Sequence, residues 1–147
     1  GLVGSEMCIR DRDIILDHYQ NPVNRGLTDE EGYIRVNTRN SSCVDNIDMM
    51  VKIENGVVVD ARFDGEACAI CTSATSMLVR AILGKSIDEV IKIVDNFSRM
   101  INEKEYDKSV LGELIVYDDI YKQPSRKRCA LLPCESIEKV VEKNREF

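Results

Sequence analysis

The sequence predicts an α+β domain in which helices pack on one face of a small antiparallel sheet of about three strands. Two runs of alternating apolar residues, 47–53 and 57–63, meet at Asn55-Gly56, which is a strong local signal for a β-hairpin. Apolar residues then recur at helical spacing over 67–83, and another helical pattern follows near the C-terminus. Strands followed by helices are typical of this fold class.

The length and charge of the chain limit the classes of function. Its 147 residues carry 20 Lys+Arg and 26 Asp+Glu, a net charge of −6, and fit a single domain. An acidic chain with 5% aromatic residues and no tryptophan lacks the basic face typical of nucleic-acid-binding proteins. No apolar run approaches the roughly 20 residues that span a bilayer. We therefore expect neither a nucleic-acid partner nor a membrane partner.

The first twelve residues, GLVGSEMCIRDR, have neither helical periodicity nor the apolar segment of a signal peptide. They resemble the in-frame translation of a sequencing-library adaptor. We interpret 1–12 as a non-native leader, either from such an adaptor or from cloning. A single domain is then expected over 13–147, with an insertion at about 102–124 that is charged and mixed in sequence. Within the insertion we expect about one short helix.

Local signals place the first elements. The pattern of residues 13–20 predicts the end of an amphipathic helix, and Asn21-Pro22 is expected to stop this helix. A short strand is expected around Tyr33–Val36, ahead of the hairpin. One face of that hairpin should be buried, because its apolar residues alternate with polar ones.

Further signals define the helices. Gly84 is expected to end the helix over 67–83, in the manner of a C′ glycine. Ser86 and Glu89 have the spacing of a capping box for the next helix. The final helical region runs from about Ser125 to Lys143, and Pro133 is expected to break or kink it.

The cysteine pattern indicates a site formed by the fold. Five cysteines remain outside the leader: Cys43, Cys68, Cys71, Cys129 and Cys134. An odd number without a secretion signal argues against a disulfide framework. Their spacing does not form the paired CxxC knuckles of a zinc finger. A site built from them would instead join three distant segments.

Three segments carry the candidate metal ligands. Cys43 and Asp45 point the same way if the chain is extended there. Cys68 stands at a predicted helix start, where the dipole favours the thiolate. The cations 126–128 should have the same effect on Cys129. Three thiols and one carboxylate suit tetrahedral zinc, or an iron–sulfur cluster with one labile oxygen ligand.

Other candidates have simpler interpretations. Cys71 and Cys134 are most readily explained as small buried hydrophobic residues. A redox role for Cys68-x-x-Cys71 would need a βαβ context that the sequence does not show. His18, beside a helix stop, is expected to pack or cap rather than to bind metal. The triplet 126–128 is also compatible with a solvated helix face.

Taken together, four segments resemble motifs of the NifU-like iron–sulfur assembly proteins. They are DHYQNPVNRG (DHYxNPxNxG in the family), SSCVDN (NPxCGDx), FDGEACAICTSATSM (FxGxGCAIxxASxSM) and RKRCALLP (RxxCALLPW). The matches keep their order and cover nearly all of 13–141. The long stretch between Cys68 and Cys129 is similar to the SufU branch, as is Arg128, where the IscU branch carries histidine.

The resemblance implies a NifU/IscU-like fold and a function. Cys43, Asp45, Cys68 and Cys129 fall on the family's ligand positions, which in SufU-like proteins hold Zn²⁺. Such proteins accept persulfide sulfur from the PLP-dependent cysteine desulfurase SufS, working with it rather than as independent enzymes. The resemblance implies Cys43 as the acceptor and leaves Cys129 open as a relay thiol. SUF assembly components and apo iron–sulfur proteins are the expected later partners, in the cytoplasm.

The sequence leaves several alternatives open. The protein could be a scaffold that assembles a [2Fe–2S] cluster on Cys43, Cys68 and Cys129, or a structural-zinc interaction module. It could also be a family member whose site has been lost, because Val44 replaces the family's glycine between the first two ligands. Glycine permits a positive φ that valine resists. We therefore expect either a turn that is not left-handed or a shifted loop.

Overall fold

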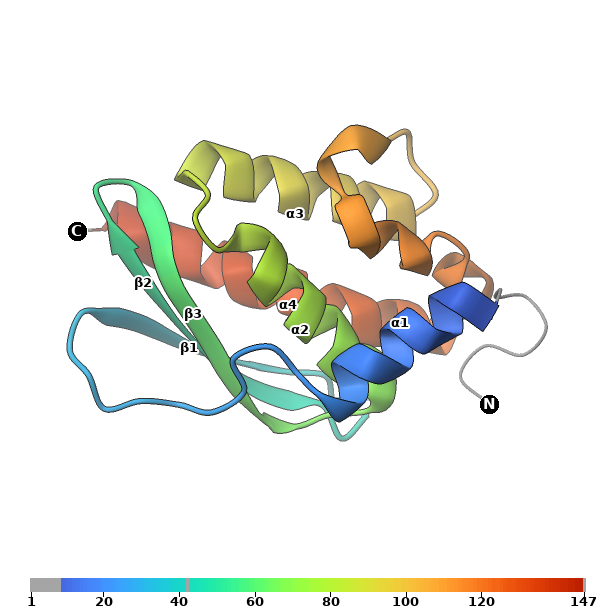
Figure 1. Cartoon of the computed structure of the whole chain (residues 1–147), viewed down its shortest axis with the longest axis horizontal. Coiled ribbons are helices and arrows are strands. Elements are labelled where there is room, and N and C mark those ends of the chain that lie inside the picture. The colour runs from blue at the N-terminus through green and yellow to red at the C-terminus, as the bar shows by residue number, and fades with distance from the viewer. Residues whose placement is uncertain (1–8, 42, 147) are drawn as a thin grey trace.

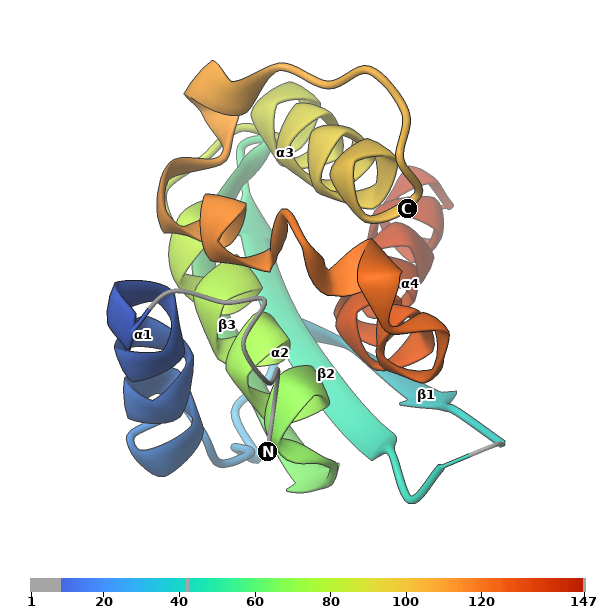
Figure 2. The same ribbon diagram turned by 90° about the vertical axis from the view of Figure 1, so that its right-hand side faces the viewer.

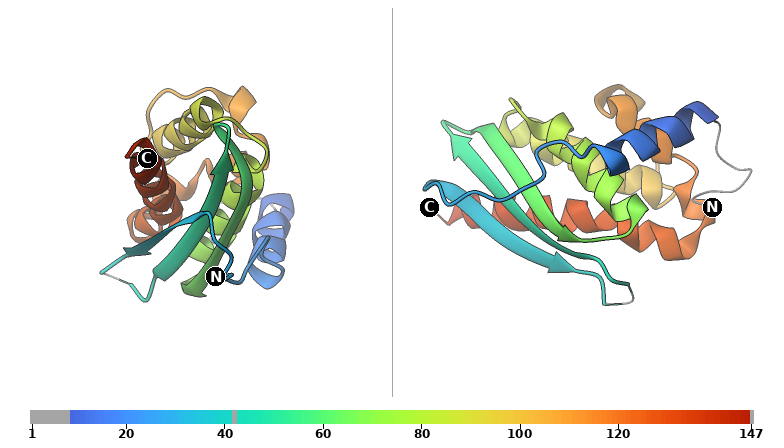
Figure 3. Two further views of the ribbon diagram at one scale, coloured as in Figure 1. Left: turned by 90° about the vertical axis from the view of Figure 1, so that its left-hand side faces the viewer. Right: turned by 60° about the horizontal axis from the view of Figure 1, so that its bottom comes forward.

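A computed structural model describes residues 9–41 and 43–146. Helices cover one face of a three-stranded antiparallel sheet with strand order β1-β2-β3 (Figures 1 and 3), as the sequence predicted. The elements are α1 (Ile9–Gln20), β1 (Tyr33–Arg39), β2 (Asn46–Glu54), β3 (Val57–Glu66), α2 (Ala69–Ile82), α3 (Ile87–Ile101), the 3₁₀ helices η2 (Lys108–Val110), η3 (Gly112–Tyr117) and η4 (Ile120–Lys122), and α4 (Pro124–Arg145).

The hairpin between β2 and β3 confirms the strongest local prediction. Asn55 and Gly56 have φ values of 53° and 75°, and two successive positive φ values are the signature of a type I′ turn. The register sets Met49 of β2 opposite Phe63 of β3, and both side chains are buried. On the other side Met49 pairs with Val36 of β1, so apolar residues of all three strands share the helix-covered face.

Helix α1 begins at Ile9, so residues 9–12 of the expected leader form its first turn. Residues 1–8 lie outside the described part of the chain, and the non-native origin of 1–12 stays a prediction. The helix ends at Gln20, directly before the predicted stop at Asn21-Pro22. Its buried face holds Ile15 and His18 and packs along α2 (Figure 1).

The predicted start and stop signals of the next helices are present. Gly84 follows α2 with a φ of 77°, a conformation that costs glycine little. The Ser86 hydroxyl accepts from the Glu89 N–H at 3.2 Å, and the Glu89 carboxylate accepts from the Ser86 N–H at 3.1 Å. This capping box opens α3 as expected.

The segment at 102–124 contains three short 3₁₀ helices, where the sequence predicted about one short helix. It crosses over α2 and α3 before entering α4 (Figure 2). Tyr117 is buried, contacts Phe97 edge to face at 5.9 Å between ring centroids, and hydrogen-bonds the Ser73 hydroxyl of α2. These tertiary contacts, which no short-range pattern reports, fix the segment against the core.

Helix α4 runs without interruption from Pro124 to Arg145. Of the break or kink expected at Pro133, the break is therefore wrong, and the kink stays a prediction. Proline lacks an N–H and normally disturbs a helix interior. Here Pro133 is buried among core residues, and the packing of α4 against α2, α3 and β1 keeps the helix continuous. Among the described residues, no helix combines the length and the apolar character needed to cross a membrane.

Candidate metal centre

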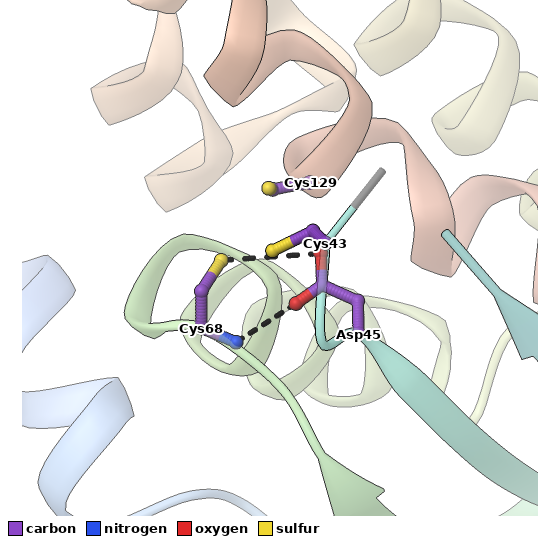
Figure 4. A group of neighbouring side chains, drawn as sticks. All are labelled: Cys43, Asp45, Cys68 and Cys129. Atoms are coloured by element: carbon purple, nitrogen blue, oxygen red, sulfur yellow. Dashed lines mark hydrogen bonds between the residues drawn. The ribbon is translucent and has the colours of Figure 1, made fainter. Parts of the chain in front are cut away.

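Four side chains from three distant segments meet at one end of the sheet. Cys43 and Asp45 come from the loop between β1 and β2, Cys68 from the start of α2, and Cys129 from α4 (Figure 4). One potential ligand atom from each residue lies within 4.8 Å of the others. The structure therefore brings together all four residues that the sequence placed in a candidate site.

The loop that carries Cys43 is closed by its own backbone. The Asn40 N–H donates to the Asp45 carbonyl at 3.0 Å, and the Cys43 N–H donates to the Asn40 carbonyl at 3.1 Å. Cys43 is exposed, whereas Asp45 is buried. The loop thus presents one candidate ligand to solvent and turns the other inward.

Val44 fits this loop without left-handed backbone. Positive φ values among described residues other than glycine occur at Asn24, Asn55 and Glu103, so Val44 keeps a negative φ. Of the two expectations for this position, the structure supports a turn that is not left-handed. The Val44 side chain is 65% exposed, which places an apolar group at the surface between two candidate ligands.

Cys68 caps the N-terminus of α2 and is tied to Asp45. The Asp45 carboxylate accepts from the Cys68 N–H at 2.8 Å, and its other oxygen lies 4.0 Å from the Cys68 sulfur (Figure 4). The Cys68 sulfur also accepts from the Cys71 N–H at 3.4 Å. One carboxylate thus links the sheet loop to the helix start.

The pKa of Cys68 corrects an expectation from the sequence. Burial raises this pKa above its ordinary value, and the nearby Asp45 charge adds to the effect. The Cys71 N–H at the helix start opposes the shift but does not reverse it. The thiolate-favouring position predicted for Cys68 is therefore outweighed by desolvation.

The pKa of Cys129 is also raised, whereas the sequence predicted that it would be lowered. Its side chain is buried and its sulfur lies 3.7 Å from the Ser125 carbonyl, one turn earlier in α4. Burial raises the pKa of the thiol, and hydrogen bonds with Cys68 and Asp45 raise it further. The preceding cations at 126–128 do not overcome these causes. Without a cation, Cys68 and Cys129 therefore favour the protonated thiol.

Among the described residues, the two cysteines outside the candidate site are buried, as the sequence predicted. Cys71 lies in the core beneath the site, and burial together with the nearby Asp45 charge raises its pKa. Cys134 is buried on α4, and burial raises its pKa as well. The sheet is antiparallel throughout, so Cys68-x-x-Cys71 lacks the βαβ setting of a thioredoxin-like motif.

His18 packs inside a polar cluster that the sequence did not predict. Its Nδ1 lies 2.7 Å from the Ser76 hydroxyl, and its Nε2 lies 3.1 Å from the Glu113 carboxylate. Arg80 binds the same carboxylate through two contacts of 2.6 and 3.0 Å. The cluster joins α1, α2 and η3, which agrees with the packing role expected for His18.

The donor set fits a thiophilic metal. Zn–S bonds of about 2.3 Å would set tetrahedral ligand atoms about 3.8 Å apart, so the observed cluster needs only a small contraction. A divalent cation would also reverse the local preference for protonated thiols, because metal binding releases their protons. Three sulfurs and one oxygen suit zinc, and they also suit an iron–sulfur cluster.

Known proteins match both the sequence and the fold. The family described as "NifU-like N terminal domain" matches residues 10–130. The zinc-dependent sulfurtransferase SufU of Bacillus subtilis is 38% identical over 133 residues, which cover 90% of this chain and 89% of the relative. The iron–sulfur cluster assembly scaffold protein IscU of Thermotoga maritima is 28% identical over 131 residues, 89% of this chain and 92% of the relative.

A solved structure agrees with these relatives. It is the crystal structure of a putative iron–sulfur cluster assembly scaffold protein for the SUF system from Fervidobacterium islandicum. It superposes with a TM-score of 0.78 at 27% identity, over 88% of this chain and 94% of that chain. The chain described here belongs to the NifU-like N-terminal domain family, which confirms the resemblance and the fold class predicted from the sequence.

Proposed function

We propose that this protein is a zinc-dependent sulfur acceptor in iron–sulfur cluster assembly. It would take persulfide sulfur from a PLP-dependent cysteine desulfurase of the SufS type. The sulfur would then pass to SUF assembly components and apo iron–sulfur proteins. Zn²⁺ would be held by Cys43, Asp45, Cys68 and Cys129. Reduced thiols are required throughout, so we place the protein in the cytoplasm.

One observation carries the proposal: the four candidate ligands differ in their access to solvent. Cys43 is exposed, while Asp45 and Cys129 are buried and Cys68 is half-buried. A closed structural site has no need of an exposed thiol, and it usually lacks an oxygen ligand. An exposed thiol held beside buried donors is what a docked sulfur donor would need to reach.

The chemistry then follows from the residues. Bound zinc would supply the positive charge that keeps the site thiols ionised at neutral pH. The Cys43 sulfur attacks the outer sulfur of the donor's persulfide, and the bond between the donor's two sulfurs breaks. The donor leaves as a thiolate and takes up a proton, while Cys43 carries the transferred sulfur. Cys129 is buried, so as a relay thiol it would act only after this step.

The first test measures metal content and stimulation of the desulfurase. Anaerobically purified protein without a His-tag should hold about one zinc per chain. It should also raise the rate of alanine formation from cysteine by a SufS-type desulfurase. Cys43→Ser should abolish the stimulation, whereas Cys134→Ala should retain it, because Cys134 lies in the core away from the ligand set. A zinc-loaded wild type that leaves the desulfurase rate unchanged would overturn the proposal.

A scaffold role is the second candidate, and the same donor set supports it. Three cysteines and a labile oxygen ligand also match a [2Fe–2S] cluster. Protein isolated with iron and acid-labile sulfide in place of zinc, and able to pass its cluster to an apo-ferredoxin, would favour this candidate. The exposure of Cys43 argues against the third hypothesis, which is a structural-zinc interaction module.

A further inference from the structure

Helix α4 lies along β1, and side-chain contacts close the seam between them. The Lys139 ammonium donates to the Asn37 carbonyl of β1 at 2.8 Å. Nearer the metal centre, the Ser136 hydroxyl donates to the Thr38 hydroxyl at 2.9 Å, and both side chains are buried. Residues later in β1 therefore meet residues earlier in α4.

Beyond Thr38 this seam opens into a polar pocket of about 200 Å³. The lining residues are Arg39, Asn40 and Ser41 on the sheet side and Arg128, Leu132 and Glu135 on α4. Ser41 stands two residues before Cys43, and Arg128 immediately precedes Cys129. The pocket therefore adjoins two of the segments that supply candidate ligands, and we call it the Arg39/Arg128 pocket.

The charge of this pocket contrasts with that of the chain. The protein has a net charge of −6, yet two guanidinium groups and one carboxylate line the pocket. Both Arg39 and Arg128 are exposed at its rim. A planar guanidinium matches a carboxylate through paired hydrogen bonds. The volume suits a single side chain, since pockets for whole small molecules are typically about 300–1,000 Å³.

We propose that the Arg39/Arg128 pocket receives an aspartate or glutamate side chain of the protein that donates sulfur to Cys43. The proposal rests on the sulfur-acceptor function and adds to it the chemistry of the docking surface. A carboxylate held here would orient the donor beside the exposed thiol. Arg39 and Arg128 are positioning residues in this arrangement, because they contact the donor protein and not the transferred sulfur.

The test is the dependence of desulfurase activity on the concentration of this protein, with zinc-loaded variants and a SufS-type desulfurase. Arg39→Glu should raise the apparent KM for this protein about tenfold at low ionic strength, with kcat at saturation unchanged. The effect should shrink as added salt screens the charges. Glu135→Gln should act in the opposite direction and lower the KM about twofold, because it removes a like charge from the pocket.

Two controls separate docking from folding and from overall charge. Arg145→Glu makes the same change in net charge at the far end of α4, about 24 Å of helix from Cys129, and should leave the KM unchanged. Arg39→Lys should recover part of the affinity lost in Arg39→Glu, because lysine restores the charge but not the paired hydrogen bonds. All variants should retain zinc and melt within a few degrees of the wild type.

The outcomes distinguish this proposal from the proposed function. If the wild type stimulates the desulfurase and Arg39→Glu has the wild-type KM, the docking proposal fails while the sulfur-acceptor function stands. A KM shift of equal size in Arg145→Glu, or a shift in the KM for free cysteine instead, also overturns it. If the wild type gives no stimulation at all, both proposals fall.

Discussion

The two sides of the candidate metal centre differ in how they are held. On the loop side, Cys43 is exposed and is fixed by a short backbone turn through Asn40. On the helix side, Cys68 caps α2, and buried Cys129 is part of a helix packed into the core. The fold thus combines a fixed, buried half-site with one candidate ligand that is open to solvent. The proposed sulfur transfer needs both properties.

Metal removal should have the largest effect on this arrangement. Zinc at 1,000-fold above its dissociation constant stabilises a protein by about 4 kcal/mol, so chelation should lower the melting temperature by many degrees. Hydrogen exchange should quicken most in the loop 40–45 and at the start of α2, which zinc would join. Equal melting temperatures with and without chelator would show that no metal links the two sides.

Ligand replacement should separate the two sides directly. Cys68→Ser should weaken zinc binding by more than about 100-fold, because it removes a ligand and alters the cap that Asp45 supports. Cys43→Ser should weaken it less, since the buried half-site stays intact. Competition with a chromophoric chelator measures both values. A greater loss of zinc affinity in Cys43→Ser than in Cys68→Ser would show that the loop side, and not the helix side, contributes more to metal binding.

The buried thiols should make the protein less stable at alkaline pH. Burial raises the pKa of Cys134, so in the folded state this thiol stays protonated above about pH 8.5, where an unfolded thiol ionises. Below that pH, the protonated thiol makes its full contribution to the free energy of unfolding. As the pH rises further, this contribution falls by about 1.4 kcal/mol per pH unit.

Denaturant titrations between pH 8 and pH 10 measure this loss. Cys134→Ala should remove the part of the slope due to Cys134, with or without zinc, because this thiol is not a candidate ligand. Burial also raises the pKa of Cys68 and Cys129, so their parts of the slope should vanish when zinc is bound. An identical slope in Cys134→Ala and wild type would contradict this assignment.

The smallest expected effect concerns Val44. A β-branched residue restricts the loop more than glycine does, so Val44→Gly should destabilise the protein by about 0.5–1 kcal/mol. It should also speed zinc transfer to a chelator, because the Cys43 segment gains freedom. Val59→Gly, at another exposed valine, is the control for a general loss of stability and should not change the transfer rate. An unchanged transfer rate in Val44→Gly would show that Val44 does not stiffen the loop.

Local signals predicted most of the fold. The Asn55-Gly56 turn and the Ser86–Glu89 capping box depend on adjacent residues, and both are present. Pro133 does not break α4, because tertiary packing holds the helix together around this residue. The His18 cluster was missed because Glu113 and Arg80 reach it from distant segments.

In the candidate site, too, local signals predicted the residues but not the effects of tertiary structure. Its four residues could be selected from residue type, local setting and family resemblance. The pKa directions of Cys68 and Cys129 could not, because burial outweighs the helix start and the neighbouring cations. Desolvation is a property of the folded molecule, and no short sequence pattern reports it.

The most direct measurement is the location of sulfur after reaction with the donor. Zinc-loaded protein would be incubated with a SufS-type desulfurase and cysteine, alkylated, digested and examined by peptide mass spectrometry. We expect one extra sulfur atom on the peptide that contains Cys43, the exposed candidate ligand. Extra sulfur first on the peptide of Cys68 or Cys129, or on no peptide at all, would contradict the assignment of Cys43 as the sulfur acceptor.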